Sequence, residues 1–402
     1  MKARPTSVII VSRHRAAALR RCLLGLTQQD HPDFEVIVVA DPTGVAAAQA
    51  LDVGLKILPF DEANISAARN LGLTHAAGEV VAFIDDDAVA EPTWLSRLCA
   101  GFDTPQVVAA TGFVRGRNGI SYQWQACEVD ATGLDHALPP KAGQYAGTPQ
   151  RAVKTQGTNC AFRRDALVRI GGFDPAFRFY LDEADANLRL ASHGLTAVIP
   201  DAQVHHGYAA STRRRADRVP LSLHEIAASI AIFLRRHAPE MLEQDTIPAI
   251  AAQEARVANL LHDRQVTTAE AKALLASLAE GWDDGMQRTL GVLTPLPDAG
   301  VFMPLPYTGP RPGLVLSGRR WQRSRLMKAA GVAAAGGEIA TVICLGPTPR
   351  AHRMQFTDQG FWLQSGGVYG RSVRQGPRLR LTSFRARIAE EMSRIARYRP
   401  VQ

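Results

Sequence analysis

Cysteine is scarce in this chain, which has 5 cysteines among 402 residues. They are Cys22, Cys99, Cys127, Cys160 and Cys344, and their number is odd and their spacing irregular. This pattern excludes a disulfide framework and a zinc site, and it is typical of reduced thiols. The sequence therefore predicts a cytoplasmic protein.

Long apolar runs are missing as well, because no stretch reaches the ~18 residues of a transmembrane helix. The chain leads directly into its first predicted strand, without the hydrophobic region of a signal peptide. Hydrophobic residues nevertheless make up 46% of the chain, and 402 residues are enough for two domains. We expect a globular cytoplasmic protein, with peripheral contact at the inner face of an anionic membrane as a further possibility.

Acidic side chains are outnumbered by basic ones, 38 against 46, so the net charge is +8. Such a surplus suits an anionic partner, for example a nucleotide sugar, an acidic glycan or a phospholipid surface. No nucleic acid partner is expected.

Three consecutive aspartates, Asp85, Asp86 and Asp87, end the apolar run EVVAFI. A buried strand that stops in carboxylates places oxygen ligands at the edge where open α/β sheets bind their ligands. Such ligands suit Mg²⁺ or Mn²⁺, and Mg²⁺ is usually held by one or two carboxylates together with a substrate's phosphates. A solvated turn or a helix cap is the alternative. Because three adjacent like charges repel one another, the sequence favours a metal–diphosphate site.

Short β-branched runs alternate with helical stripes in the first part of the chain. Strands are predicted at 7–12, 34–41, 55–60 and in the run before the aspartates. A helix is predicted between the first two strands, and another begins at Asn64 as its N-cap and stops at Gly78. Strands alternating with helices predict an α/β fold with a doubly wound, mostly parallel sheet.

Several segments of the chain resemble the nucleotide-binding half of family 2 glycosyltransferases, which have the GT-A fold. The segments are SVIIVSRHR (7–15), FEVIVVAD (34–41), NISAARNLGLTHAAGEVVAFIDDDAVAEPTWL (64–95), GTNCAFRRDALVRIGGFDPAF (157–177) and FYLDEADANLRLASHG (179–194). Their order and ordinary spacing make the resemblance specific, and it covers about residues 5–210. It implies metal-dependent, inverting transfer of a sugar from a nucleotide-diphosphate sugar. The acceptor would be a hydroxyl of a glycan, a lipid-linked sugar or another cell-envelope molecule.

The resemblance also implies which residues contact the nucleotide base. Ser12 and His14 would lie at the base, where the family usually has a Tyr-Asn pair and this chain has Arg13 and His14. Two acids usually end the second strand, but here Ala40 precedes Asp41. Asp41 would therefore be the one carboxylate left to read the base, and the identity of the nucleotide stays open.

The diphosphate and metal positions follow from the same resemblance. Arg69 matches a residue expected near the diphosphate, and Asp85 and Asp87 match the DXD pair of the family. Asp85 would serve the ribose or the metal, Asp87 the metal, and Asp86 belongs to the same donor-binding group. His205 is a candidate to complete the set of metal ligands. The alternative is that it lies at the end of a strand and makes only an ordinary hydrogen bond.

An acidic segment later in the chain supplies the candidate catalytic base. Inverting transfer needs a carboxylate that takes the proton of the acceptor hydroxyl, and positive charge on the departing diphosphate. The family commonly reads Glu-Asp where this chain reads Asp-Glu, so the base aligns with Glu183. Asp182 and Asp185 are the other candidates. The alternative is that these acids have only a structural role, because the dipole of a helix favours acidic side chains at its N-terminus.

For the second half of the chain, the sequence predicts segments that differ from the glycosyltransferase-like first half. We expect a glycosyltransferase domain at 1–212, a helical segment at 213–300 and a small α/β module at 301–402. The chain ends in a basic amphipathic helix, which either docks on its own domain or meets an anionic membrane; docking is favoured. Arg213, Arg214 and Arg215 form either a phosphate-clamping loop or solvated surface.

Two other functions were weighed against a glycosyltransferase. A sugar-phosphate nucleotidyltransferase needs a glycine-rich phosphate loop after its first strand, and the corresponding VSRHRAAALRR has no glycine. A non-catalytic relative that binds a glycan or a partner protein would be expected to lack the metal acids or the base. Asp85, Asp87 and Glu183 are all present, so the sequence favours an enzyme.

Overall fold

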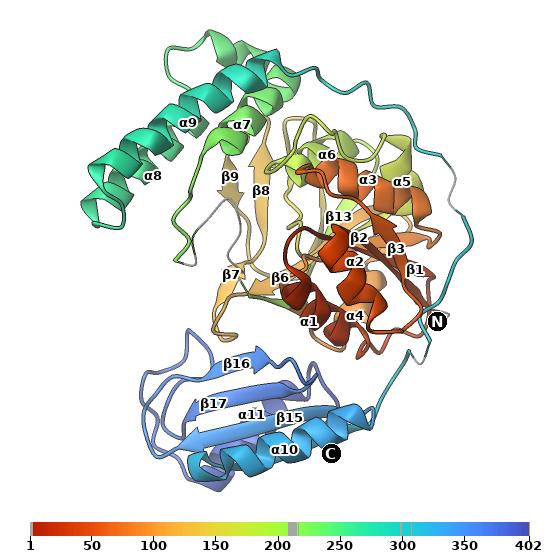
Figure 1. The fold of residues 1–402 in the computed structure, drawn as a ribbon, viewed down its shortest axis with the longest axis vertical. Helices are drawn as coiled ribbons and strands as arrows, with labels where there is room; N and C mark the ends of the chain where they lie inside the picture. Colours follow the sequence, from red (N-terminus) through yellow and green to blue (C-terminus); the bar gives the residue numbers. More distant parts are fainter. Residues whose placement is uncertain (1–2, 208–214, 216, 298–299, 307, 402) are drawn as a thin grey trace.

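A ten-stranded mixed sheet lies at the centre of the molecule (Figure 1). The computed structural model describes residues 3–207, 215, 217–297, 300–306 and 308–401. The strands of this sheet are β1 (Thr6–Ser12), β2 (Phe34–Ala40), β3 (Lys56–Pro59), β4 (Val80–Phe83), β5 (Ala88–Ala90), β6 (Val107–Arg115), β7 (Tyr122–Trp124), β10 (Gly143–Ala146), β12 (Cys160–Arg163) and β13 (Leu195–His206). Their order is β10-β13-β6-β12-β4-β1-β2-β3, with β5 beside β13 and β7 beside β6.

The first four strands pair in parallel, as their buried apolar runs predict. The helices that cover the sheet are α1 (Ala16–Leu26), α2 (Pro42–Gln49), α3 (Ile65–His75), α4 (Trp94–Ala100), α5 (Arg164–Arg169) and α6 (Asp182–Leu190). One buried cluster includes residues of α1, α2 and α4, and a second includes residues of α3, α5 and α6. Because helices cover both faces, the predicted doubly wound α/β fold is confirmed.

The start of α3 follows the sequence prediction, whereas its end does not. Asn64 caps the helix, since its side-chain oxygen accepts a hydrogen bond from the Ala67 nitrogen at 3.0 Å. The helix ends at His75, short of the predicted stop at Gly78. A Cβ atom at Gly78 would lie 2.6 Å from the backbone nitrogen of Ser7. Glycine is therefore required there for close approach to β1 and not for helix termination.

The sheet changes direction beyond β4, where the aspartates lie. β12 runs antiparallel between β4 and β6, and β13 runs parallel to β6 with an irregularity between Ile199 and Gln203. After this irregularity β13 also pairs antiparallel with the short strand β5. The end of β13 therefore lies beside the segment that follows the aspartates.

Helices and a small sheet extend this core. The small sheet contains β8 (Cys127–Asp130), β9 (Asp135–Ala137) and β11 (Arg151–Val153), and the helices are α7 (His224–His237), α8 (Pro248–His262) and α9 (Thr268–Gln287). α7 and α9 pack closely, because a Cβ atom at Gly281 would lie 2.1 Å from the His224 carbonyl oxygen. The predicted helical periodicity of this part of the chain is confirmed.

The C-terminal module, which we define as residues 313–401, contains a separate four-stranded sheet. Its elements are β14 (Gly313–Arg319), α10 (Arg323–Ala335), β15 (Ile339–Gly346), β16 (Arg353–Phe356), β17 (Trp362–Gly367) and α11 (Phe384–Ile395). β14, α10 and β15 form a β-α-β unit, because β14 and β15 pair in parallel, which agrees with the α/β character that the sequence predicts for this module. The boundaries of the three predicted domains stay a prediction.

α11 packs on its own module, since Arg387, Ile388, Glu391 and Ile395 are buried. This contact favours the docked alternative for the terminal helix. Among the described residues, no helix has the length and apolar character needed to cross a membrane.

A buried ion pair fixes the C-terminal module to the central sheet. Arg399 contacts Glu91 through two hydrogen bonds of 2.7 Å, and the same carboxylate accepts from His205 Nε2 at 2.7 Å. The guanidinium of Arg399 also lies 3.7 Å from the centre of the Trp362 ring. Glu91 and Arg399 are 2% and 3% exposed, so neither charge is solvated if the other is removed.

We predict that Arg399→Met lowers the free energy of unfolding by about 3–5 kcal/mol, because it leaves the Glu91 carboxylate buried with one partner fewer. Arg397→Met is the matched control. The Arg397 side chain is 62% exposed and pairs with Asp201 at 3.0 Å, so its loss should cost about 0–1 kcal/mol. Urea unfolding followed by circular dichroism measures both. Equal losses in the two variants would show that the buried pair does not hold the module.

Candidate functional site: an acidic metal centre and a carboxylate pair

The pairing of β5 with β13 brings a histidine to the aspartates. His206 pairs with Ala88, one residue after Asp87. The His206 Nε2 atom lies 3.0 Å from Asp87 Oδ1 and 3.9 Å from Asp85 Oδ2. Asp85 and Asp87 come from the end of β4 and His206 from the end of β13, so two strand ends build one cluster.

This cluster has the composition of a cation site. Asp85, Asp87 and His206 each offer one ligand atom, and these atoms lie within 4.8 Å of one another. His206 Nδ1 donates to Gln123 Oε1 at 2.9 Å, which turns Nε2 toward the carboxylates. Two carboxylate oxygens and one oriented imidazole therefore fit a divalent cation.

His205, the histidine proposed from the sequence, does not join this group. Its Nε2 atom donates to Glu91, on the side of the strand that faces the C-terminal module. Burial lowers the pKa of His205. Successive side chains of a strand point to opposite faces, so only one of the two histidines can reach the aspartates. The geometry favours His206.

Asp86 lies in a different environment from its two neighbours. Its carboxylate accepts from Ser12 Oγ at 2.7 Å and lies 2.7 Å from Arg15 Nη2. Burial raises the pKa of Asp86 to about 7. Arg15 also reaches Asp87, at 3.4 Å between Nη1 and Oδ2. The sequence interpretation did not select Arg15, although it stands in the loop after the first strand.

His14 and Asp41 lie together at the ends of β1 and β2. Asp41 caps α2: its carboxylate accepts from the Thr43 hydroxyl at 2.6 Å and the His14 backbone nitrogen at 3.1 Å. The Asp41 side chain is 1% exposed and that of His14 is 48% exposed. His14 is therefore the accessible member of this pair, and the Asp41 carboxylate already has local partners.

The second acidic group lies at the start of α6. Tyr180 and Leu181 have positive φ angles of 72° and 64°, an uncommon conformation for residues other than glycine. They lead into Asp182 and Glu183 in the first turn of the helix. Arg69, from α3, forms an ion pair with Asp182, and its Nη1 atom lies 3.7 Å from Glu183 Oε2. Backbone strain of this kind is typical of functional sites.

The two carboxyl groups of this pair differ in protonation and exposure. Burial raises the pKa of Asp182 well above its usual value. Burial alone would also raise the pKa of Glu183, but the hydrogen bond from Asp182 and the charge of Arg69 lower it overall. The Asp182 side chain is 3% exposed and that of Glu183 is 20% exposed. Glu183 is therefore the ionised and reachable carboxylate at neutral pH.

Gly157 lies against the same pair. Its backbone nitrogen donates to Glu183 Oε1 at 3.3 Å, and a Cβ atom there would lie 2.6 Å from Arg69 Nη2. The segment 157–177 thus contributes backbone to the acidic site.

Residues 7–171, which include the aspartates and Arg69, match glycosyl transferase family 2. This part of the chain is a family 2 glycosyltransferase domain. The chain is 37% identical over 185 residues to succinoglycan biosynthesis protein ExoM of Rhizobium meliloti, covering 42% of this chain and 55% of that protein. It is 26% identical over 182 residues to the glucosyl-dolichyl phosphate glucuronosyltransferase of Haloferax volcanii, covering 42% and 54%. The chain thus spans about half the length of these curated relatives.

A solved structure, the mannosyltransferase PcManGT of Pyrobaculum calidifontis in complex with GDP-Man and Mn²⁺, aligns at 19% identity with a TM-score of 0.41. The alignment covers 69% of this chain and 80% of that chain.

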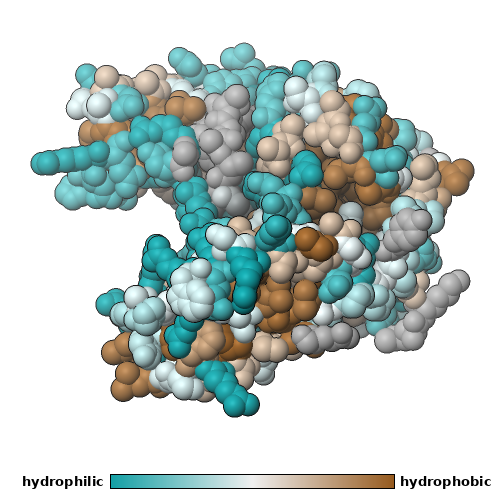
Figure 2. Space-filling view, turned by 60° about the horizontal axis from the view of Figure 1, so that its bottom comes forward, coloured by the Kyte–Doolittle hydropathy of each residue, from teal (hydrophilic) through white to brown (hydrophobic). Residues whose placement is uncertain are grey.

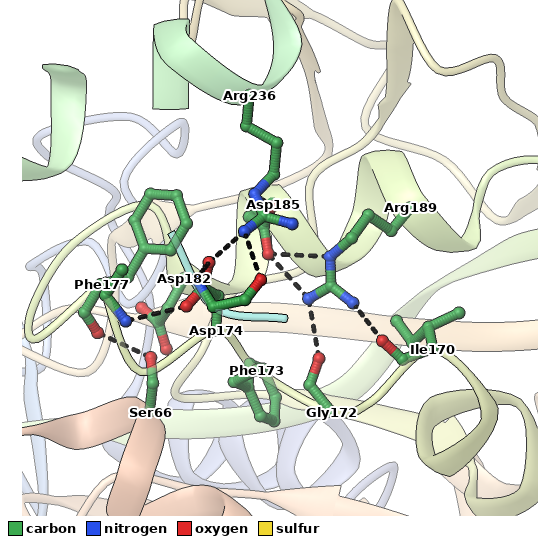
Figure 3. Close-up of polar contacts among 12 residues, drawn as sticks. Ser66, Ile170, Gly172, Phe173, Asp174, Phe177, Asp182, Asp185, Arg189 and Arg236 are labelled. Carbon is green, nitrogen blue, oxygen red and sulfur yellow. Dashed lines mark hydrogen bonds and ion pairs between the residues drawn. The ribbon is translucent and has the colours of Figure 1, made fainter. Parts of the chain in front are cut away.

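Asp185, the third acidic candidate, faces away from Glu183. Its carboxylate contacts Arg189 at 2.7 Å and His237 of α7 at 2.9 Å, and Figure 3 shows its bonds to Arg189. Burial alone would raise its pKa, but Arg189 and His237 lower it to about 2. Arg189 in turn donates to the carbonyl oxygens of Ile170 and Gly172, at 2.8 and 2.7 Å. Asp185 therefore fixes α6 to α7 and the preceding loop.

Two of the three arginines proposed from the sequence as a phosphate-clamping loop, Arg213 and Arg214, lie outside the described residues. Arg215 is described, and it forms an ion pair with Asp217 at 2.6 Å.

We predict that His206→Ala and Asp87→Ala each weaken Mn²⁺ binding by at least about tenfold, because each removes one ligand of the cluster. His193→Ala, which removes an exposed histidine, should leave the affinity unchanged. Titration calorimetry with MnCl₂ measures the three variants beside the wild type. Unchanged affinity in His206→Ala would exclude this histidine as a ligand, whatever the result for Asp87→Ala.

Proposed function

We propose that the chain is a metal-dependent, inverting glycosyltransferase. It would move a sugar from a nucleotide-diphosphate sugar to a hydroxyl of a glycan, a lipid-linked sugar or another cell-envelope acceptor. The observation that carries this proposal is the presence of two distinct acidic groups in one domain. Asp85, Asp87 and His206 form a cation cluster, and Asp182 and Glu183 form a carboxyl pair with one ionised member.

The donor would be held at the ends of β1, β2 and β4. Asp85, Asp87 and His206 would hold a divalent cation, which would supply positive charge to the departing diphosphate. We favour Mn²⁺ over Mg²⁺, because an imidazole ligand suits a transition metal better than the hard Mg²⁺ ion. Arg15 lies beside the same aspartates and would add a fixed positive charge. Ser12, His14, Asp41 and Asp86 would shape the nucleotide end of the pocket.

Glu183 would act as the general base. As the acceptor oxygen forms its bond to the anomeric carbon, the bond from that carbon to the diphosphate oxygen breaks, and the hydroxyl proton passes to the Glu183 carboxylate. Attack opposite to the leaving group inverts the anomeric configuration. Asp182 would hold Glu183 in place through their hydrogen bond, and Arg69 would keep Glu183 ionised. Asp185 is not required, because its carboxylate is held by Arg189 and His237.

The proposed acceptor class is supported by the names of two relatives. The names of these two relatives refer to succinoglycan biosynthesis and to a glucosyl-dolichyl phosphate, which supports a surface glycan or a lipid-linked acceptor. We place the enzyme in the cytoplasm, with peripheral contact at the inner face of the membrane. Since α11 is docked on its own module, such contact would have to use another surface.

The test begins with a thermal-shift screen of nucleotide sugars with and without Mn²⁺, because a ligand that binds the native state raises its melting temperature. With the donor identified, Glu183→Gln is expected to lower turnover by about 10²–10⁴, since the amide cannot accept the proton. Donor affinity should change little. Transfer assays and calorimetry measure the two effects separately.

Asp182→Asn is the matched control, because it removes the neighbouring carboxylate at constant size. Its turnover should fall less than that of Glu183→Gln. Normal turnover in Glu183→Gln together with collapse in Asp182→Asn would exchange the two roles. A wild type that binds a nucleotide sugar but transfers nothing to any hydroxyl acceptor would favour a non-catalytic binding protein.

A further inference from the structure

A pocket of about 460 Å³ lies where the turn between β6 and β7 meets the C-terminal module. Figure 1 shows β7 above β16 at this junction. The pocket is lined by Arg117, Arg218 and Arg353, together with polar side chains that include Asn118, Tyr122 and Gln123. Its volume is within the range of small-molecule sites.

The walls of this pocket are held in place by hydrogen bonds. Asn118 Oδ1 accepts from the backbone nitrogens of Ile120 and Ser121, both at 2.9 Å. The Met354 nitrogen, next to Arg353, donates to the Asn118 carbonyl oxygen at 2.9 Å. A Cβ atom at Gly119 would lie 2.5 Å from the Met354 carbonyl oxygen. The turn is therefore seated directly on β16, and these bonds hold the backbone beside Arg117 and Arg353.

The pocket adjoins the candidate metal cluster. Gln123 lines the pocket, and its side-chain oxygen accepts the hydrogen bond from His206 Nδ1. The ring of Trp124, the next residue, lies 5.5 Å from the His206 ring. A ligand in the pocket would thus lie beside the donor site but outside the aspartate cluster.

The charge of the lining indicates the chemistry of this ligand. Three arginines line the pocket, and no acidic residue is among its described lining residues. Guanidinium groups bind phosphate and carboxylate oxygens through paired, charge-assisted hydrogen bonds. Figure 2 shows that hydrophilic side chains also border the indentation between the C-terminal module and the rest of the molecule. The pocket is therefore suited to an oxyanion.

We propose that this pocket binds a phosphate or carboxylate group carried by the acceptor. The inference rests on the proposed glycosyltransferase function. We assign the group to the acceptor and not to the donor because Arg218 and Arg353 lie outside residues 7–171, which match the family. The pocket is thus built partly from chain outside the domain that the relatives share. Such a pocket suits the acceptor, because the acceptor is the substrate that differs between relatives. The acceptor would accordingly be a phosphate-bearing or uronate-bearing sugar.

The test uses methyl phosphate and methyl glucuronide as probes, with affinities read by ligand-observed NMR on the full chain. Wild-type protein should bind at least one probe, and the tighter probe distinguishes phosphate from carboxylate. Arg353→Gln should weaken that binding by about tenfold, since a charged hydrogen-bonding partner is lost. Arg350→Gln is the matched control, because it removes an exposed arginine of the same module that does not line the pocket. Arg117→Gln provides a second variant on the opposite wall.

Further measurements separate this inference from the proposed function. Asp87→Ala should lose metal-dependent nucleotide binding but keep probe binding, and Arg353→Gln should do the reverse. Probe binding should persist when Mn²⁺ and the nucleoside diphosphate found in the screen saturate the protein, whereas displacement would assign the pocket to the donor and overturn the acceptor assignment. No probe binding by the wild type, or equal binding by Arg353→Gln and Arg350→Gln, would overturn the inference even if sugar transfer is observed.

Discussion

The antiparallel pairing of β5 with β13 is the constraint on which the candidate site depends. β5 is three residues long and begins one residue after Asp87, so its register decides what faces the aspartates. The observed register places His206 opposite Ala88 and directs His205 to Glu91. A shift of one residue would exchange the two histidines, because side chains alternate along a strand. The candidate metal cluster and the anchor of the C-terminal module therefore both depend on the register of this short strand pair.

The sequence predicts the first half of the fold well because its signals are local. Buried runs give β1 to β4, and the Asn64 side chain caps α3 three residues away. The choice between His205 and His206 depends instead on a contact with a strand more than 100 residues earlier, which periodicity cannot specify. The placement of Asp185 likewise depends on His237 of α7. Arg15 was missed because the loop sequence does not reveal where its guanidinium points.

Charge burial follows a common rule at the two acidic groups. At the aspartates, Asp86 takes Ser12 and Arg15 as partners and has a pKa raised by burial. At the start of α6, Asp182 takes Arg69 and has a pKa raised by burial. Burial also raises the pKa of Asp85, so protonation is favoured at two of the three aspartates and at Asp182 of the carboxyl pair. Two adjacent acids can share a site because only part of their charge is present at once.

The bond between Glu91 and Arg399 joins residues 308 positions apart in the chain. During synthesis on the ribosome, at about 5–20 residues per second, roughly 15–60 s separate the two residues. β5 and β13 can pair long before Arg399 emerges, so the newly made glycosyltransferase domain exists for a time with Glu91 held by His205 alone. The strand pair that carries the candidate metal ligands therefore forms first, and its contact with the C-terminal module is completed only after Arg399 has been made.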